Sequence, residues 1–397
     1  MISLSDRSKK VSPSLTLELT AKINAMIAGG LDVVKFGAGE PDFDTPDHIK
    51  DAAVEALNQG LTKYTPVSGI VELKEAIVDK FQRDNSLSYD PGQVIVSCGA
   101  KHTIYNILQA ICNSGDEVIF AAPYWVSYIE MVKLADATPI VLQTTPERNF
   151  CLTPSQIESA VTANTKAIII GSPSNPTGTT YDTHSLRQIG ELAVKNQFYL
   201  ISDEIYEALL YDGVKHQSLA SFGEEVKALT FVVNGVSKAY SMTGWRIGYT
   251  AGPEDAIKAM SKIQSHSTSN PTSIAQSAAL AAISGLQEPV AEMLNAFQKR
   301  RDLICQRFDD IDGVEYVKPQ GAFYLFPDFS AHYGRTISGY PINSSQDLAT
   351  YLLDDAKVGA VPGDGFGADN HMRFSFATSE TEINRGLERV KKALVGK

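Results

Sequence analysis

Residues 228–250 read ALTFVVNGVSKAYSMTGWRIGYT, an apolar run followed by a polar loop and a second apolar run. The first run, at 229–233, predicts a buried strand, and the loop after it carries Ser237, Lys238 and Arg246. A lysine whose pKa is lowered by burial or by nearby cations forms a Schiff base with an aldehyde cofactor, and an arginine binds phosphate. A loop lysine is more often simply solvated, so this stretch alone leaves both interpretations open.

Short apolar runs before this stretch alternate with amphipathic segments. We expect strands at residues 94–97, 117–120, 139–142, 166–170, 198–201 and 229–233. Helices are expected at residues 102–111, 126–134 and 185–195. Near-continuous apolar strands separated by helices indicate an α/β fold with a largely parallel sheet that is covered on both faces.

The two ends of the chain follow a different pattern. Before residue 94 we expect helices at 15–27, 47–57 and 71–81 and a strand at 33–36. After residue 252 we expect helices at 254–263, 274–283, 290–308, 348–356 and 382–394. Strands are expected there at 314–317, 322–326, 358–361 and 372–376. Residues 332–345, rich in Gly, Ser and Tyr, are expected to form an irregular surface insertion.

A chain of 397 residues is too long for one compact core, so we expect two domains. The predicted helix at 290–308 is long enough to carry the chain from a large domain to a smaller α+β domain. We assign residues 1–45 to an N-terminal segment that packs with the small domain, 46–295 to the large domain and 296–397 to the small domain.

Composition excludes several classes of protein. The chain has 35 basic and 46 acidic residues and a net charge of −11, which disfavours nucleic acid or an anionic membrane as its main partner. The four cysteines have no CxxC spacing, which argues against a zinc site or a disulfide framework and favours a reducing compartment. We expect no bound metal. The first residues lack the apolar core of a signal peptide and no run is suited to cross a bilayer, so we expect a cytoplasmic protein.

Polar residues gather where the predicted strands end. They are Gly99, Ala100, Lys101, Trp125, Asn175, Asp203, Tyr206, Lys238 and Arg246. In an open α/β sheet, ligands bind outside the carboxyl ends of the strands. One such residue would mean little, but a set that converges on one edge of the sheet predicts a binding site.

Each of these residues also has an ordinary structural interpretation. Trp125 is either a core residue or a flat surface on which an aromatic ring stacks. Asn175 is a turn residue or a donor to a ring hydroxyl, and Asp203 is a helix N-cap or the buried anion that a protonated pyridine nitrogen needs. The helix start expected at 99–101 is either a phosphate-binding site or an ordinary helix N-terminus without a ligand. Arg373, on a predicted strand, is a surface ion-pair partner or a fork for a substrate carboxylate.

Seven motifs now point to one family. The chain resembles the aminotransferases of the aspartate aminotransferase superfamily (class I/II), which use pyridoxal 5′-phosphate and have fold type I. The motifs are AGEPDFDTP (38–46), YWVSY (124–128), SPSNPTG (172–178), SDEIYE (202–207), SKAYSMTGWRIGY (237–249), QGAFYLF (320–326) and HMRFSFATS (371–379). They cover nearly the whole chain in the family's order, and the bacterial-type and plastid-type aspartate aminotransferases, some of which accept prephenate, are the most similar.

The resemblance implies a large domain with a mostly parallel seven-stranded sheet, which binds the cofactor, and a smaller α+β domain. It implies that Lys238 forms the Schiff base and then moves the proton between substrate and cofactor. Asp203 resembles the partner of the pyridinium nitrogen. Asn175 and Tyr206 resemble the ligands of the ring hydroxyl, and Trp125 resembles the residue that stacks on the ring.

The resemblance also implies which residues bind the cofactor phosphate and which bind the substrate α-carboxylate. Ser237, Arg246 and the backbone at Gly99 and Ala100 resemble the phosphate cradle. Tyr64 resembles the tyrosine that reaches the phosphate in the neighbouring subunit, which implies a homodimer with shared active sites. The substrate α-carboxylate is implied to bind Arg373, together with Gly39 and Asn175.

The side-chain pocket departs from the better-known enzymes of the family. Those enzymes bind the distal carboxylate with an arginine of the partner subunit, and the corresponding region here, 265–271, contains no Arg. The subgroup that this chain resembles uses a lysine at the position of Lys101, helped by hydroxyl groups near the N-terminus, a role that Ser14 and Thr16 fit. A lysine is a point charge and is less selective in geometry than an arginine fork.

We therefore expect a homodimeric aminotransferase that passes the amino group of aspartate to 2-oxoglutarate by a ping-pong mechanism. A prephenate or aromatic amino-acid aminotransferase, or a lyase or decarboxylase on the same fold, is the alternative enzyme. A transcriptional regulator with an aminotransferase-like domain is the alternative outside enzymes. It would need a DNA-binding segment before the motifs, which begin at Ala38, and a less acidic chain.

Overall fold

A seven-stranded sheet forms the centre of the larger part of the molecule in the computed structural model, which describes residues 2–13 and 15–395, without the side chains of 15–17. Its strand order is β2-β8-β7-β6-β5-β3-β4. The bounds are β2 (Val94–Ser97), β3 (Glu117–Ala122), β4 (Thr138–Gln143), β5 (Thr165–Gly171), β6 (Tyr199–Asp203), β7 (Thr230–Gly235) and β8 (Gly248–Ala251). Only β8 runs antiparallel to its neighbours, β2 and β7. The prediction of an α/β fold with a mostly parallel sheet is confirmed.

Apolar residues on both faces of the strands explain why helices cover both sides of this sheet. In β5, Ala167 and Ile169 belong to one buried cluster, and Ile168 and Ile170 belong to another. Successive side chains of a strand point to opposite faces, so each cluster marks one covered face. The covering helices are α5 (Ala100–Ile111), α6 (Ser127–Leu134) and α10 (Glu254–Ser267) on one face, and α7 (Pro154–Ala160), α8 (Thr183–Asn196) and α9 (Glu224–Lys227) on the other.

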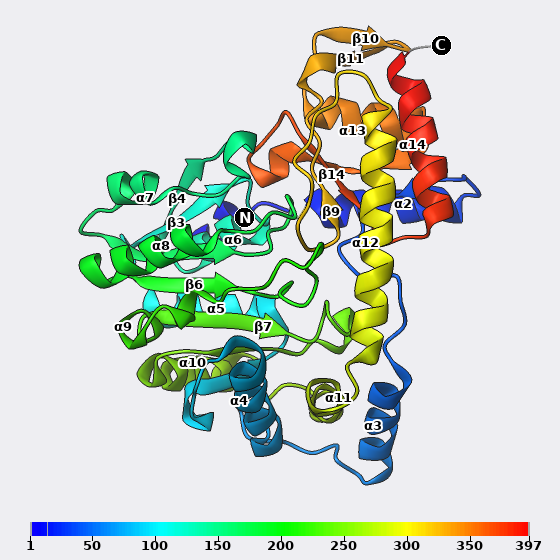
Figure 1. The fold of residues 1–397 in the computed structure, drawn as a ribbon. Helices are drawn as coiled ribbons and strands as arrows, with labels where there is room; N and C mark the ends of the chain where they lie inside the picture. Colours follow the sequence, from blue (N-terminus) through cyan, green and yellow to red (C-terminus); the bar gives the residue numbers. More distant parts are fainter. Residues whose placement is uncertain (1, 14, 396–397) are drawn as a thin grey trace.

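Three further helices pack at the β2 edge of the sheet, below it in the view of Figure 1. They are α3 (Asp47–Asn58), α4 (Val71–Asn85) and α11 (Ser273–Ser284). Their apolar faces form one buried cluster with β2 and β8. All three were predicted from helical spacing of apolar residues.

The reversal at β8 brings two loops together. Gly248, the first residue of β8, pairs with Ser97 on one side and with Gly235 on the other. A Cβ atom on Gly248 would lie 2.2 Å from the backbone nitrogen of Ala100. The start of α5 therefore rests directly on β8, next to the loop between β7 and β8.

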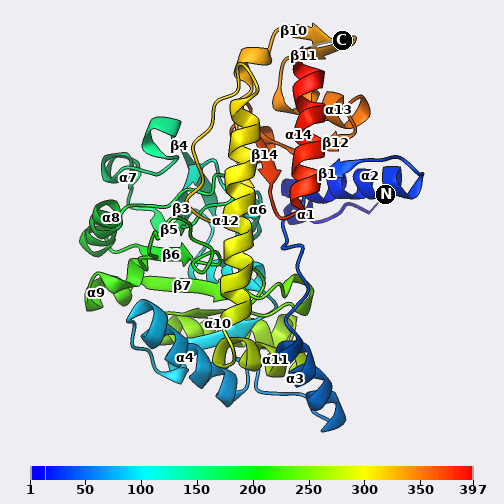
Figure 2. The same ribbon diagram turned by 45° about the vertical axis from the view of Figure 1, so that its right-hand side comes forward.

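A smaller group of strands and helices follows the long helix α12 (Glu288–Asp309), which runs from beside α11 to this group (Figures 1 and 2). Its three-stranded antiparallel sheet has the order β13-β14-β9. The bounds are β9 (Tyr324–Leu325), β10 (Arg335–Ile337), β11 (Tyr340–Ile342), α13 (Ser345–Asp354), β12 (Val358–Gly359), β13 (Val361–Pro362), β14 (Met372–Ser375) and α14 (Glu380–Val395). The N-terminal elements α1 (Asp6–Lys10), α2 (Leu15–Ala28) and β1 (Val34–Lys35) complete the fold.

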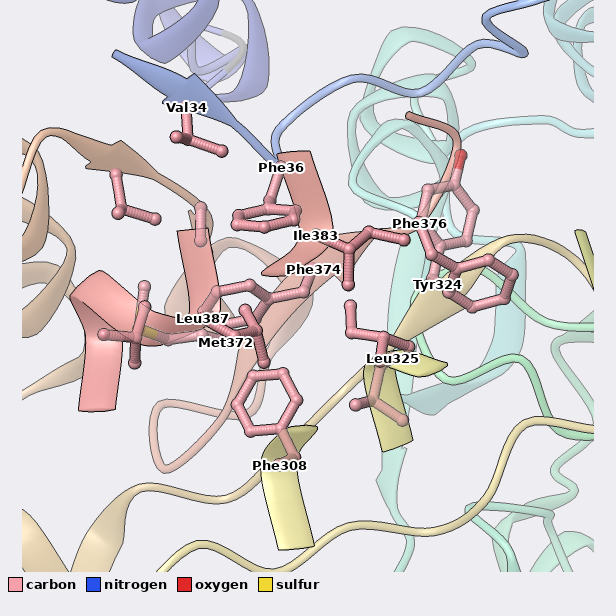
Figure 3. Packing of buried hydrophobic residues seen from close by; sticks show 14 of the residues in the cluster. Val34, Phe36, Phe308, Tyr324, Leu325, Met372, Phe374, Phe376, Ile383 and Leu387 are labelled. Carbon is pink, nitrogen blue, oxygen red and sulfur yellow. The ribbon is translucent and has the colours of Figure 1, made fainter. Parts of the chain in front are cut away.

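The core of this smaller part ties the N-terminal strand to the C-terminal one. Figure 3 shows Phe36, Phe308 and Phe374 packed together. The ring centroids of Phe374 lie 5.4 Å from Phe36 and 5.0 Å from Phe308. β1 pairs in parallel with β12, and the backbone nitrogen of Ser375 donates to the carbonyl of Phe36 over 2.8 Å. The loop after β1 is thereby held next to β14.

The structure differs from the sequence predictions in a few places. The predicted strand at 314–317 forms only an isolated bridge between Glu315 and Asp328. Residues 332–345 contain the β10–β11 hairpin, whose turn residues Ser338 and Gly339 both have positive φ, as a type I′ turn requires. The short helix α7 was not predicted. The domain boundaries after residues 45 and 295 stay predictions.

Among the helices of residues 2–13 and 15–395, none combines the length and the apolar character that crossing a bilayer requires.

Candidate active site

A cavity of about 440 Å³ lies at the carboxyl edge of the central sheet, where the sheet meets the β9 and β14 strands. Most of the predicted site residues line it. They are Gly39, Ala100, Lys101, Trp125, Asn175, Asp203, Tyr206, Ser237, Lys238, Arg246 and Arg373. These residues are spread over more than 300 positions of sequence, and the strand order of the sheet brings them to one place.

Lys238 follows β7 and reaches into the cavity. Its Nζ donates to the backbone carbonyl of Gly39 over 2.5 Å and lies 5.9 Å from the ring centroid of Tyr206. Burial, and then the positive charge of Arg373, lower the pKa of Lys238 to about 8. An amine with this pKa has a substantial neutral fraction near physiological pH, which is the form that attacks a carbonyl carbon.

Asp203, the last residue of β6, is the buried anion of the cavity. The residue is 6% exposed, and its Oδ2 accepts from the Tyr128 hydroxyl over 2.6 Å. Burial raises the pKa of Asp203, and the hydrogen bond from Tyr128 opposes this rise. A Cβ atom on Gly171 would lie 3.1 Å from the Tyr128 oxygen, so a glycine at the end of β5 leaves room for this hydrogen bond.

One end of the cavity suits an anion. α5 begins at Ala100 after Gly99, whose φ of +92° favours glycine. Arg246 lies against this start, and a Cβ atom on Gly99 would be 2.5 Å from its Nη2. Arg246 Nη1 donates to the Thr243 carbonyl over 2.8 Å and Nη2 to the Cys98 carbonyl over 3.2 Å, which fixes the guanidinium. Free N–H groups at a helix start together with a fixed cation form a cradle for a phosphate.

The other end holds a buried arginine. Arg373 in β14 is 3% exposed and donates to Asn175 Oδ1 over 2.9 Å and to the Gly37 carbonyl over 3.0 Å. Its guanidinium carbon lies 4.4 Å from the ring centroid of Tyr324 and 5.2 Å from that of Phe366. Its Nε has no hydrogen-bond partner within the described residues. A fixed, desolvated guanidinium with spare donors is suited to a carboxylate.

Lys101, in the first turn of α5, also lines the cavity. Its Nζ lies 5.1 Å from the ring centroid of Trp125. Partial burial, and then Arg246, lower the pKa of Lys101. Lys101 is partly exposed on the cavity wall, so its charge is available to a ligand.

Some predicted site residues are not brought to the cavity. Tyr64 is 91% exposed and lies outside the cavity lining. Gly99 stands just behind the lining, next to Arg246. Ser14 and the side chain of Thr16 lie outside the described residues.

Several cavity residues were not singled out from the sequence, among them Tyr128, Tyr324 and Glu40. Tyr128 lies in the first turn of α6, three residues after Trp125, which precedes the helix, and the two ring centroids are 5.4 Å apart. Tyr324 lies in the QGAFYLF motif and in the strand predicted at 322–326, but no role was assigned to it. Glu40 accepts from the Thr243 hydroxyl over 2.8 Å at the cavity wall, and nothing in the local sequence indicates this contact.

One cluster near the site has the composition of a metal site, although no bound metal was expected. Ligand atoms of Glu204, Glu207 and His216 lie within 4.8 Å of one another. Glu204 accepts from His216 over 2.7 Å and also from Ser hydroxyls, and Glu207 is paired with the Lys80 ammonium. A buried ammonium group at this position favours an ion-pair network over a cation site.

Comparison with known proteins agrees with this geometry. Residues 31–390 match the model of the family described as aminotransferase class I and II. The chain is 51% identical over 387 residues to an aspartate aminotransferase of Bacillus sp. (strain YM-2), covering 98% of each chain. It is 47% identical over 398 residues to an aspartate/prephenate aminotransferase of Cereibacter sphaeroides, covering 100% of each.

A solved structure is also close to this fold. The aspartate aminotransferase from Thermus thermophilus with maleate superimposes with a TM-score of 0.93 and is 43% identical, over 98% of this chain and 99% of that one. One cavity holds Lys238 with its lowered pKa, the buried Asp203, and an arginine at each end, Arg246 and Arg373. The matches to known proteins agree with this arrangement. The chain belongs to the class I and II aminotransferase family.

Proposed function

We propose that the chain is a pyridoxal 5′-phosphate-dependent aspartate aminotransferase, which passes the amino group of aspartate to 2-oxoglutarate in two half-reactions. The observation that carries this proposal is the pairing of Lys238, whose pKa is lowered to about 8, with the buried carboxylate of Asp203 in one cavity. An amine that attacks an aldehyde must be neutral, and a protonated pyridine nitrogen needs a buried anion.

The cavity residues fit each part of this cofactor. Arg246 and the start of α5 suit the phosphate, with Ser237 beside them. The indole of Trp125 offers a flat face to the ring. Because Asn175 Oδ1 accepts from Arg373, the amide N–H groups of Asn175 are left to donate to the ring hydroxyl oxygen. When bound, pyridoxal 5′-phosphate supplies an electron sink next to the substrate.

The remaining chemistry belongs to residues of the chain itself. Lys238 takes the proton that leaves the substrate Cα and returns it on the cofactor side. Arg373 and the backbone near Gly39 hold the α-carboxylate, which turns the Cα–H bond toward Lys238. The loop that carries Gly39 closes over Lys238 and helps to exclude water from the reacting atoms.

Lys101 is the proposed ligand of the distal carboxylate. It is on the cavity wall, and no arginine occupies the 265–271 segment. The relatives named aspartate aminotransferase, and the Thermus thermophilus structure with maleate, support a dicarboxylate substrate. A point charge discriminates weakly, so prephenate is the second candidate, favoured by the Cereibacter sphaeroides relative and by a bifunctional relative from Petunia hybrida that is 47% identical.

We also propose a homodimer with shared active sites. Tyr64 is 91% exposed, and the large apolar side chains of Val54, Leu57 and Leu61 are exposed on the same segment of chain. Exposed apolar groups gathered in one region are typical of an interface. Tyr64 would then reach the phosphate of the neighbouring subunit's cofactor.

An absorbance spectrum tests the proposal directly. Purified protein reconstituted with the cofactor should show the visible band of lysine-bound cofactor. Aspartate without an acceptor should convert it to the amine form, and 2-oxoglutarate should restore it. Recovery with prephenate would add the second activity. If the cofactor binds but aspartate leaves the spectrum unchanged, the proposed substrate is wrong, and failure to bind the cofactor would reject the proposed chemistry.

A further inference from the structure

Tyr324 contacts two residues of the proposed site, Tyr206 and Arg373. It is the first residue of β9, pairs with Ser375 of β14 and is fully buried, although its side chain lines the cavity. Its hydroxyl lies 2.9 Å from the hydroxyl of Tyr206, and its ring centroid lies 4.4 Å from the guanidinium carbon of Arg373. One tyrosine side chain therefore contacts both Tyr206 and Arg373.

The hydroxyl groups of Tyr206 and Tyr324 share one hydrogen bond, in which either oxygen can be the donor. Two hydroxyl groups that share a single hydrogen bond carry two protons, and only one proton lies between the oxygens. If Tyr324 donates, the Tyr206 O–H is free to point into the cavity, where it meets an acceptor. A donor chain of this kind also polarises the second O–H group and strengthens its hydrogen bond.

The ring of Tyr324 acts on a different group. Arg373 is stacked between this ring and Phe366, while Asn175 and the Gly37 carbonyl hold its edge. A guanidinium on an aromatic face is held in one plane, and a desolvated cation–π contact is stronger than an exposed one. The same tyrosine hydroxyl lies within 3.5 Å of the position that a Cβ atom would take on Gly39, so it also supports the loop that covers Lys238.

We propose that Tyr324 is a positioning residue with two separable actions: its hydroxyl directs the Tyr206 proton toward the cofactor, and its ring orients Arg373 for the substrate carboxylate. This inference rests on the proposed function. It assigns the two actions to different atoms of one side chain, so different substitutions should remove them one at a time.

The hydroxyl action is tested with Tyr324→Phe, Tyr206→Phe and the double variant. Tyr324→Phe keeps the ring, so kcat should fall about 2- to 10-fold, as expected for one lost hydrogen bond. A donated hydrogen bond stabilises the anionic ring oxygen, so weaker donation should move the pH midpoint of the cofactor's visible absorbance upward. In the Tyr206→Phe background, Tyr324→Phe should change neither quantity further, because its effect passes through Tyr206.

The ring action is tested with Tyr324→Leu and the dissociation constant of succinate, a dicarboxylate that cannot react. Loss of the aromatic face should weaken succinate binding by about 5- to 30-fold. Tyr324→Phe should leave succinate binding within about twofold of wild type, since the ring remains. Thermal unfolding of each variant checks that the fold is retained. Tyr351→Phe, which removes another buried hydroxyl that donates to a backbone carbonyl, is the matched control and should leave the spectrum and kcat unchanged.

The outcomes separate the inference from the proposed function. A wild-type protein without the cofactor spectrum rejects both. A wild-type protein with the spectrum, but with additive effects of Tyr206→Phe and Tyr324→Phe, rejects the hydroxyl action. Equal weakening of succinate binding in Tyr324→Phe and Tyr324→Leu rejects the ring action.

Discussion

Replacing Gly248 by alanine should weaken cofactor binding without removing any group that touches the cofactor. Gly248 has no positive φ, so alanine is allowed by the backbone at this position. The added Cβ atom would lie 2.2 Å from the Ala100 nitrogen and 2.4 Å from the Gly99 carbonyl carbon, where ordinary contacts begin at 3.4 Å. The start of α5 must therefore move by 1.2 Å, since 3.4 minus 2.2 is 1.2.

The strand itself cannot move instead. Gly248 is paired on both sides, with Ser97 and Gly235, and a shift would break both pairings. A displacement of 1.2 Å is enough to break a hydrogen bond between a backbone N–H at the start of α5 and the phosphate. A hydrogen bond to a charged group contributes about 1.5–3 kcal/mol, so the cofactor dissociation constant should rise about 10- to 150-fold.

The assay is reconstitution of the cofactor-free protein, followed by visible absorbance at increasing pyridoxal 5′-phosphate. Gly244→Ala is the matched control, because Gly244 lies in the loop just before β8 and a Cβ atom there would meet no heavy atom within 4 Å. Circular dichroism and thermal unfolding establish that both variants are folded. A folded Gly248→Ala protein that binds the cofactor as tightly as Gly244→Ala would refute the assignment of the phosphate to the start of α5.

Four further predictions concern the charged residues of the cavity. Burial lowers the pKa of Lys238 to about 8, so between that pH and the usual pKa of lysine the unfolded chain binds one more proton than the folded chain. The free energy of unfolding of the cofactor-free protein, measured relative to Lys238→Met, should therefore rise with pH across this interval. A difference that does not change with pH would contradict a buried amine at this position. Lys238→Ala should abolish turnover, and substantial residual activity would reject its role. Arg373→Ala should raise KM for every amino acid by about 30-fold or more, as loss of a charged pair implies, whereas an effect on aspartate alone would make Arg373 a side-chain ligand. Lys101→Ala should lower kcat/KM for aspartate and glutamate more than for aromatic amino acids. An equal loss for all substrates would indicate that Lys101 binds the cofactor phosphate instead of the distal carboxylate.

The sequence predicted the central sheet well because its strands are buried on both faces. Strands such as 94–97 and 166–170 have continuous apolar runs, and each was placed within two residues of its observed bounds. Short strands at the rim of the smaller part carry little local signal. The 314–317 segment has apolar residues but no neighbouring strand, and the β10–β11 hairpin depends on its turn residues rather than on apolar alternation.

Some features of the site could likewise be predicted from the sequence and others could not. Residues at strand ends, such as Asp203 and Lys238, could be placed at one edge of the sheet from topology alone. Contacts between distant segments could not be predicted in this way, because no local sequence pattern identifies the residue on the other segment. The Tyr128–Asp203 hydrogen bond joins residues 75 positions apart, and the Tyr206–Tyr324 pair joins residues 118 apart. The roles of the site residues, Tyr64 among them, stay predictions.

The hydrogen bond from Arg373 to the Gly37 carbonyl joins residues 336 positions apart in the sequence. This separation determines the order in which the parts of the site form during synthesis. A ribosome releases the chain from its N-terminus, and long-range contacts wait for the later segment. Residues 99–246, which contain the groups proposed for the cofactor, leave the ribosome well before β14. The end of the cavity that holds Arg373 is therefore the last part of the site to be completed. A chain truncated before β14 would lack Arg373, the proposed ligand of the α-carboxylate, while keeping every residue proposed to bind the cofactor within its own subunit.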